Sequence, residues 1–276
     1  MKEHLQDWSS LWILPFLLAC SVSKVQNGVT PDQDQINIRT AVTDQLGNLY
    51  FAKYSNEIIK QDPDGKQIGY FSNNQLGKIG IIDATSPLKV MVFYPDFNTG
   101  VVLDRRLLET GRFNLIDMGF GEIDLVAFSR DGTIWIFDDH EQRLYKIDQQ
   151  GQIIRTGDDL RLTFNERLQP TRMIEAGEFL YLGIPGKGVL VFDLFGQYKS
   201  QVLFDDLLDF QVIQDGILIF EKADSLNEVN ILTHTEKRFL IKDELRVGRI
   251  LVTKQQLIHI TQEAISHLPL DALNWE

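Results

Sequence analysis

The feature that most constrains this chain is a sequence element that recurs about every forty residues. Each copy is a turn followed by an alternating strand with an aromatic or large aliphatic residue near its centre, as in D-G-T-I-W-I-F at residues 131–137. Successive copies are 40, 45, 45, 39 and 39 residues apart, measured between the turn residues Gly47, Pro87, Gly132, Gly177, Gly216 and Gln255. Such a period indicates a repeat architecture in which each unit packs against its neighbours.

Each copy also has other apolar runs around it. One short run precedes it, a third follows it, and a fourth usually comes after a polar turn, as in residues 57–71, 143–155 and 189–200. Four short antiparallel strands per unit are typical of the blade of a β-propeller. Because a blade needs neighbours on both faces, closing six units into a ring removes the exposed ends. We therefore predict an all-β, six-bladed β-propeller with four antiparallel strands per blade over residues 36–276; a pair of β-sandwiches is the alternative.

The last unit is the least complete. It supplies three clear runs, of which the third spans residues 264–270. A fourth strand taken from the segment before Gln35 would close the ring, although the sequence does not choose its residues. The tail L-P-L-D-A-L-N-W, residues 268–275, is apolar for a terminus, so we expect it to dock on the body, with presentation to a partner as the alternative.

The N-terminal region reads as a leader. Residues 11–19 form an apolar run, which fits the hydrophobic region of an export signal but is too short for a bilayer-spanning helix of roughly twenty residues. The run ends in L-L-A-C, which resembles the lipobox of bacterial lipoproteins and implies cleavage before a lipidated Cys20. We predict a signal peptide at 1–19 and a lipidated cysteine with a polar tether at 20–35. An uncleaved signal anchor or a buried structural thiol is the alternative.

Composition excludes several classes of protein. The 27 Lys and Arg against 39 Asp and Glu give a net charge of −12, which works against nucleic-acid binding because that affinity depends on cationic side chains. One cysteine permits neither an intrachain disulfide nor a cysteine-based metal cage. An acidic body is also not attracted to anionic lipid, so acyl chains on Cys20 would be the only visible membrane attachment.

Two copies of the repeat approximate the phrase D-x-x-G-x-Φ-a-Φ…Φ-x-K-Φ-D-x-x-G, where Φ is apolar and a is aromatic. This phrase resembles the NHL and quinoprotein-like repeats of six-bladed propellers. Together with the lipobox, the chain resembles the propeller lipoproteins of Gram-negative envelopes. The shared residues specify strands and turns, so the resemblance implies fold more than activity. They are Asp44, Gly47, Tyr50, Lys60, Asp62 and Gly65 in one copy, and Asp131, Gly132, Trp135, Lys146, Asp148 and Gly151 in the other.

Candidate chemistry is sparse. The loop that contains Asp138, Asp139 and Glu141 has enough carboxylates to hold a hard cation, but a solvated hairpin loop is the preferred interpretation. The D-P-D-G at 62–65 reads as a β-turn and the glycine-rich segment 183–188 as a hairpin. No two histidines lie four residues apart, and no G-x-S-x-G occurs. We therefore predict no catalytic residue and no cofactor.

Two functional hypotheses follow. The first is a lipid-anchored, non-enzymatic propeller that serves as an interaction or scaffold subunit of a cell-envelope assembly, attached to the outer membrane of a Gram-negative bacterium and bound to envelope proteins. The second is an enzyme, or a binder of a sugar or lactone, that uses the axial pocket with a divalent ion at the channel mouth. Asp124, Asn165 and Asp209 lie on or near the predicted inner strands and are the candidates for that ion.

Overall fold

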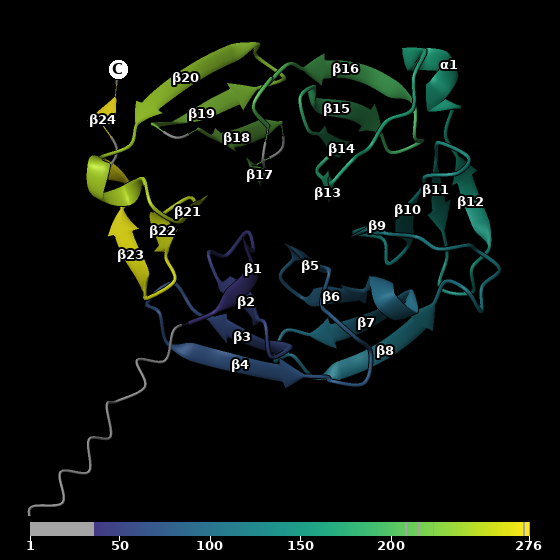
Figure 1. Ribbon diagram of the computed structural model, residues 1–276, viewed down its shortest axis with the longest axis horizontal. Coiled ribbons are helices and arrows are strands. Elements are labelled where there is room, and N and C mark those ends of the chain that lie inside the picture. The colour runs from purple at the N-terminus through teal and green to yellow at the C-terminus, as the bar shows by residue number, and fades with distance from the viewer. Residues whose placement is uncertain (1–35, 208, 215, 223, 273, 276) are drawn as a thin grey trace, which may run out of the picture. The chain divides into compact units, whose positions relative to one another are not determined.

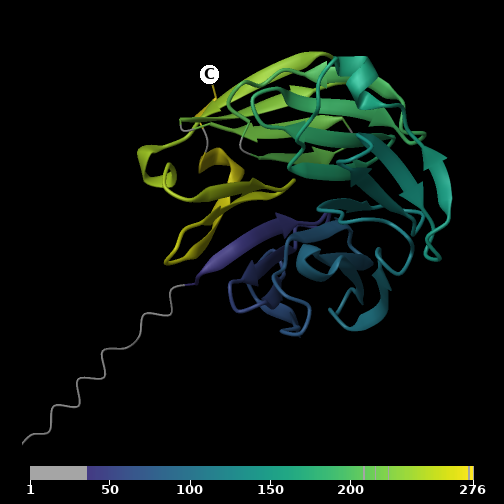
Figure 2. The same ribbon diagram turned by 45° about the vertical axis from the view of Figure 1, so that its right-hand side comes forward.

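The computed structural model describes residues 36–207, 209–214, 216–222, 224–272 and 274–275. These residues form six antiparallel sheets side by side around a common axis (Figures 1 and 2), as the repeat predicts. The predicted signal peptide, Cys20, the tether and any strand before Gln35 lie outside the described residues. No helix within the described part has both the length and the apolar character needed to span a membrane.

Blades 1 to 4 each contain four strands in chain order from the axis outward. Blade 1 contains β1 Ile38–Thr43, β2 Leu49–Lys53, β3 Glu57–Gln61 and β4 Gln67–Ser72. Blade 2 contains β5 Ile81–Ser86, β6 Lys89–Tyr94, β7 Thr99–Asp104 and β8 Glu109–Asn114, with the 3-10 helix η1 at Pro95–Phe97. Blade 3 contains β9 Leu125–Phe128, β10 Ile134–Asp138, β11 Arg143–Ile147 and β12 Ile153–Thr156. The short helix α1, Leu160–Phe164, leads to blade 4, which contains β13 Arg172–Ala176, β14 Phe179–Ile184, β15 Gly188–Asp193 and β16 Tyr198–Val202.

The last two blades depart from the regular pattern. Blade 5 contains β17 Phe210–Gln214, β18 Ile217–Glu221, β19 Ser225–Asn230 and β20 Thr235–Leu240. Blade 6 follows the 3-10 helix η2 Asp243–Leu245 and has three described strands, β21 Arg249–Val252, β22 Gln256–Ile260 and β23 Ile265–Pro269. After η3, Leu270–Ala272, the tail forms β24 Asn274–Trp275, which pairs with β20 and makes the fifth sheet five-stranded (Figure 1). The tail thus docks on the body, as predicted.

All six predicted turn residues lie between the first and second strands of their blades. Four of these six turn residues are glycines, and all four adopt positive φ, for instance 84° at Gly47 and 85° at Gly132. Glycine adopts this backbone conformation without steric cost. The turns between the third and fourth strands use aspartate instead. The Asp62 carboxylate accepts hydrogen bonds from the amides of Asp64 and Lys66, and the same pattern recurs at Asp104, Asp148 and Asp193.

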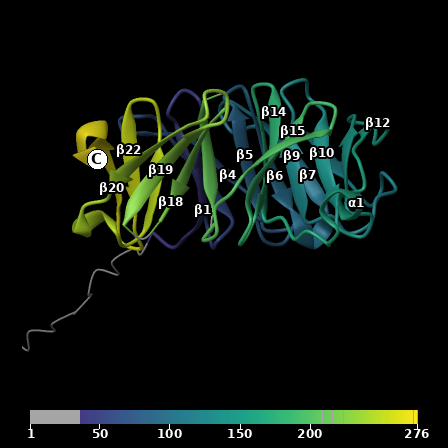
Figure 3. The ribbon, with the colours of Figure 1, turned by 90° about the horizontal axis from the view of Figure 1, so that it is seen from above.

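The strands run between two faces of the ring, seen edge-on in Figure 3. We call the face with the first–second and third–fourth strand turns the tight-turn face. The opposite face, with the second–third strand turns and the links between blades, is the connection face. In an antiparallel meander successive turns alternate between the two edges of the sheet, so every inner strand of this ring begins at the connection face.

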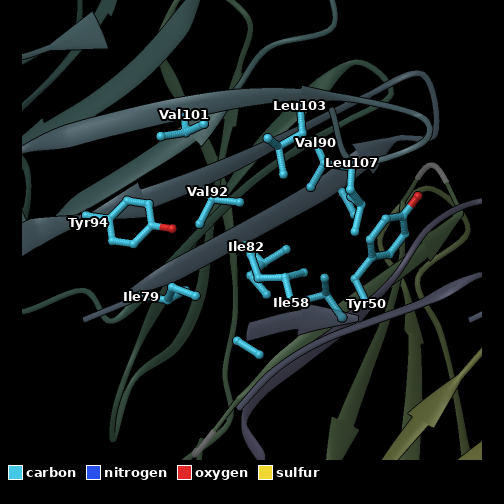
Figure 4. Close-up of a cluster of buried hydrophobic side chains, with 13 residues drawn as sticks. Tyr50, Ile58, Ile79, Ile82, Val90, Val92, Tyr94, Val101, Leu103 and Leu107 are labelled. Carbon is cyan, nitrogen blue, oxygen red and sulfur yellow. The ribbon is translucent and has the colours of Figure 1, made fainter. Parts of the chain in front are cut away.

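The core lies between the blades. Figure 4 shows the cluster between blades 1 and 2, which includes Tyr50, Ile82, Val92, Tyr94 and Leu103, all buried. Both faces of each blade are covered, so a strand such as β6 is buried at five consecutive positions, Val90 to Tyr94. This explains why the sequence shows continuous apolar runs rather than strict alternation.

Candidate functional site

The residues that carry the repeat resemblance are structural. In blade 1 the Tyr50 hydroxyl donates to Asp44 at 2.9 Å, and Lys60 Nζ lies 4.9 Å from the centre of the Tyr50 ring. Lys60 also donates to the carbonyl of Arg105 in blade 2 at 3.0 Å. In blade 3 Lys146 Nζ lies 5.2 Å from the centre of the Trp135 ring. The lysine of the repeat therefore packs over the central aromatic residue and contributes to the joint between blades.

Blades 3 and 4 meet at a buried carboxylate that has a full set of donors. Glu175 of β13 accepts from Ser129 Oγ and Trp135 Nε1, both at 2.7 Å, and from the Arg130 amide at 3.1 Å. Lys146 Nζ lies 3.4 Å from the same carboxylate and 3.1 Å from Asp131. Because every group in this set has a partner, we assign the cluster to stability.

The axial cavity is narrow. Its volume is about 130 Å³, and it is lined mainly by aliphatic and threonine side chains of the inner strands, with Asp83 and Arg172 among them. Asp83 accepts from the Phe128 amide at 2.7 Å and from Thr85 Oγ1 at 2.6 Å. Burial raises the pKa of this carboxyl group, although these hydrogen bonds oppose the shift. Asp83 thus links blades 2 and 3.

The connection-face end of the axis holds an ionic bridge across three blades. Asp209, just before β17, pairs with Arg172 at the start of β13, where Nη1 and Oδ2 are 3.1 Å apart. The same oxygen accepts from Arg249 Nη2 at the start of β21. Desolvation lowers the pKa of Arg249, and the Asp209 charge opposes that shift. Arg172 Nε is buried and has no acceptor among the described residues.

Beside this bridge a cavity of about 840 Å³ lies between blades 5 and 6. Glu221 of β18 is half-buried there, and burial raises its pKa despite a hydrogen bond from the Ile250 amide at 3.3 Å. Asp205 and Asp206 are exposed and have no ion-pair partner within the described segments. The carboxylates outnumber the cations, so the cavity favours a cationic group. It is lined by Asp205, Asp206, Leu207, Asp209, Glu221, Lys222, Asp224, Ile241, Arg246, Gly248 and Arg249.

Of the carboxylates singled out in the sequence, Asp138 is the last residue of β10, and Asp139 and Glu141 lie in the turn between β10 and β11. Asp138 accepts from the Glu141 amide at 2.8 Å, and Asp139 pairs with Arg167 at 2.9 Å. Glu141 lies 3.4 Å from exposed His140. Across the described ranges, no group of three or more His, Cys, Asp or Glu side chains is arranged to hold a metal ion.

The three channel-mouth candidates do not line a common cavity. Asp124 is exposed just before β9, and Asn165 is the exposed C-terminal cap of α1, with a φ of 56°. Asp209 does lie at the axis, but in an ionic bridge with two arginines. Its partners come from other blades, and Arg172, Glu221 and Arg249 gave no sequence signal because no motif connects them.

The comparisons establish the fold. The sequence matches no protein-family model and no curated protein. A streptogramin B lyase structure aligns with a TM-score of 0.56 and 15% identity, covering 86% of this chain and 84% of that one. A catalytically inactive virginiamycin B lyase from Staphylococcus aureus, solved with quinupristin, aligns at 0.55 and 13% over 87% of each chain. The Pan2 WD40 domain of Neurospora crassa aligns at 0.53 and 8%, over 88% and 82%. Because enzymes and a WD40 domain share this propeller, the fold does not select an activity.

Proposed function

We propose that this propeller is an interaction subunit of a cell-envelope assembly and that it binds a partner protein through its connection face. The observation that carries the proposal is the cavity between blades 5 and 6. A volume of about 840 Å³ accommodates several side chains of a partner. Its walls are mainly the links before β17 and β21 and the turn after β18, and the strands contribute Glu221 and Arg249.

The charges of the cavity define the partner. Asp205 and Asp206 stand at its rim without cationic partners among the described residues, and Glu221 lies deeper with its pKa raised by burial. The positive charge of a partner's lysine or arginine would stabilise the ionised form of Glu221 and pair with the rim carboxylates. The partner segment is therefore expected to be basic.

The sequence also supports a lipid anchor that attaches the same subunit to a membrane. We propose that Cys20 is lipidated and that the anchor holds the propeller at the outer membrane of a Gram-negative bacterium. The supporting pattern is the apolar run 11–19 that ends in L-L-A-C. Cys20→Ala should abolish labelling by a fatty-acid analogue and leave an uncleaved precursor; continued labelling would refute the anchor without affecting the partner site.

The partner site is tested with two variants of equal charge change. Asp205→Lys with Asp206→Lys alters the cavity rim, and Asp64→Lys with Glu178→Lys alters exposed carboxylates on the tight-turn face. Proteins that co-purify after gentle detergent extraction are identified by mass spectrometry. We expect the same partner with the wild type and the tight-turn variant, and its loss from the rim variant. Recovery of monomer alone from the wild type, or equal loss in both variants, would contradict the proposal.

A further inference from the structure

A second cavity on the connection face lies between blades 6 and 1, with a volume of about 260 Å³. Two arginines line it, Arg39 and Arg249, and no Asp or Glu does. The whole chain carries a net charge of −12, whereas the charged residues that line this cavity are all positive. The remaining lining residues are Asn37, Ile38, Thr40, Ala41, Tyr54, Gly248, Ile260, Thr261 and Gln262.

Arg39 is held in place by backbone irregularity and by stacking. The pairing of β1 with β2 shifts register between Ile38 and Thr40, so Arg39 occupies a β-bulge. Bulges redirect a side chain and are frequent beside binding sites. The Arg39 guanidinium carbon lies 4.8 Å from the centre of the Tyr54 ring, which fixes the plane of the group.

This guanidinium lacks the acceptors that such a group requires. Arg39 Nε is buried and has no hydrogen-bond partner, and Arg39 forms no ion pair with any described residue. A buried donor without an acceptor costs free energy that a bound acceptor recovers. Arg249 supplies a second positive charge, and its pairing with Asp209 uses Nη2. The cavity therefore favours a planar anion that accepts from a fork of N–H donors.

We propose that this cavity binds the carboxylate of a ligand, either a free organic acid or the C-terminus of a peptide. A monoanion suits the site because the negative charge of Asp209, which pairs with Arg249, opposes a dianion more strongly than a monoanion. Its volume is below the roughly 300–1,000 Å³ of cavities that enclose a whole drug-sized ligand, so the carboxylate enters and the remainder stays outside. The Tyr54 ring, 63% exposed, offers an apolar surface to that remainder.

Isothermal titration of the full chain in detergent tests the site with four probes: sodium acetate, the tripeptide Ala-Ala-Ala, its C-terminal amide, and inorganic phosphate. We expect acetate or the tripeptide acid to bind and the amide not to bind. Acetate as strong as the tripeptide identifies a free acid as the ligand class, whereas a much stronger tripeptide identifies a peptide C-terminus. Binding of neither carboxylate, or stronger binding of phosphate than of both, would overturn the proposal.

Variants locate the bound anion. Arg39→Gln should weaken binding by roughly tenfold, the scale of one lost charge-assisted interaction. Arg155→Gln is the matched control. Arg155 of β12 in blade 3 also stacks on an aromatic ring, 5.6 Å from the centre of Phe195, but it does not line this cavity. Arg39→Lys keeps the charge and loses the fork, so it should weaken binding even if the glutamine variant folds poorly. Equal binding by the wild type and the Arg39 variants would refute the site.

Carboxylates of the chain itself are tested as competitors, since Asp32 and Asp34 precede Ile36 in the sequence. The double variant Asp32→Asn, Asp34→Asn separates the two cases. Binding that is unchanged in this variant supports an external ligand. Binding that appears only in this variant would show that the chain fills the cavity itself, and would overturn the proposal.

Discussion

Two interfaces between blades place an acid beside cations, and they differ in how completely the acid is partnered. Between blades 3 and 4 the Glu175 side chain is 4% exposed and every polar neighbour has a partner. In the bridge that joins blades 4, 5 and 6 the Asp209 side chain is 35% exposed, Arg172 Nε lacks an acceptor within the described residues, and a cavity of about 840 Å³ opens beside it between blades 5 and 6.

The difference shows how one repeat fold can use some blade interfaces for stability and leave others open for binding. The inner strands occupy corresponding places in the six blades, so the side chains and the links between blades decide whether an interface is filled or left open. Trp135 fills the first interface with a large ring that also donates to Glu175. At the second, the links before β17 and β21 leave space, and charge remains available to a partner.

Removing the central acid of the filled interface should have the largest effect. Glu175→Ala leaves Trp135 Nε1, Ser129 Oγ and Lys146 buried without their shared acceptor. We expect a loss of about 3–5 kcal/mol in the free energy of unfolding, measured by chemical denaturation. Glu178→Ala, an exposed change three residues away, should stay within about 0.5 kcal/mol. A Glu175→Ala loss below about 1 kcal/mol would show that the interface is not held by this acid.

The corresponding change at the open interface should cost less. Asp209→Ala leaves Arg172 and Arg249 without their shared partner, but both arginine side chains retain access to water, at 24% and 29% exposure. We expect a loss of about 1–2 kcal/mol in the same denaturation experiment. Asp206→Ala, in the same cavity, is the control and should be neutral. If Asp209→Ala lost as much free energy of unfolding as Glu175→Ala, the two interfaces would not differ in how much their central acid contributes to stability.

The two interfaces should respond to pH with opposite sign. Burial raises the pKa of Glu221, so the folded state holds that proton more tightly and stability falls as pH rises from the ordinary pKa of 4.5 through the raised value. Burial also opposes ionisation of Asp131, but the hydrogen bonds from Thr133 and Lys146 outweigh it and lower the pKa to about 2. The stability from Asp131 is present above the ordinary pKa of 3.8 and is lost as pH falls through about 2.

Denaturation across a pH series checks both signs. Glu221→Gln should remove the decrease in stability above pH 4.5, and Asp131→Asn should remove the part of the acid loss that falls between pH 3.8 and about 2. Identical pH profiles for the wild type and Glu221→Gln would show that the pKa of Glu221 is the same in the folded and the unfolded state, and would contradict this prediction.

The smallest effect is expected in the acidic β10–β11 turn, outside both interfaces. The triple variant Asp138→Asn, Asp139→Asn, Glu141→Gln removes exposed pairs, each worth about 0–1 kcal/mol. Calcium should not shift the thermal midpoint of the wild type or of the variant, because among the described residues no group of three or more His, Cys, Asp or Glu side chains is arranged to hold a metal ion. If calcium raised the thermal midpoint of the wild type but not of the triple variant, these carboxylates would be a cation site, which contradicts this prediction.

The fold was predictable because its signals are local. Gly47 and Gly132 lie in hairpin turns at positive φ, and the spacing of such turn residues along the sequence reveals the period. The pairing of β24 with β20 was predicted only as docking of an apolar tail. Its register depends on Phe239 and Leu240, which nothing in the tail sequence specifies.

The candidate sites were not predictable for the converse reason. Asp209 was recognised as a mouth residue, but its partners Arg172 and Arg249 are 37 and 40 positions away and belong to no motif. Arg39 lies in a bulge, which a one-residue shift in strand pairing creates and an isolated strand sequence does not reveal. Such sites arise where blades meet, and only the closed ring brings these residues together.

The seam between blades 6 and 1 joins the last blade to the first, and within the described residues no chain segment links the two. It is held by apolar packing between Leu49 and Ile258 and their neighbours, and by hydrogen bonds such as Gln256 Nε2 to the Pro63 carbonyl at 2.8 Å. Transient opening of the ring should therefore begin at this seam. Since Arg39 and Arg249 stand on opposite sides of it, a bound carboxylate would act as a reversible cross-link that slows amide exchange in blades 1 and 6 together.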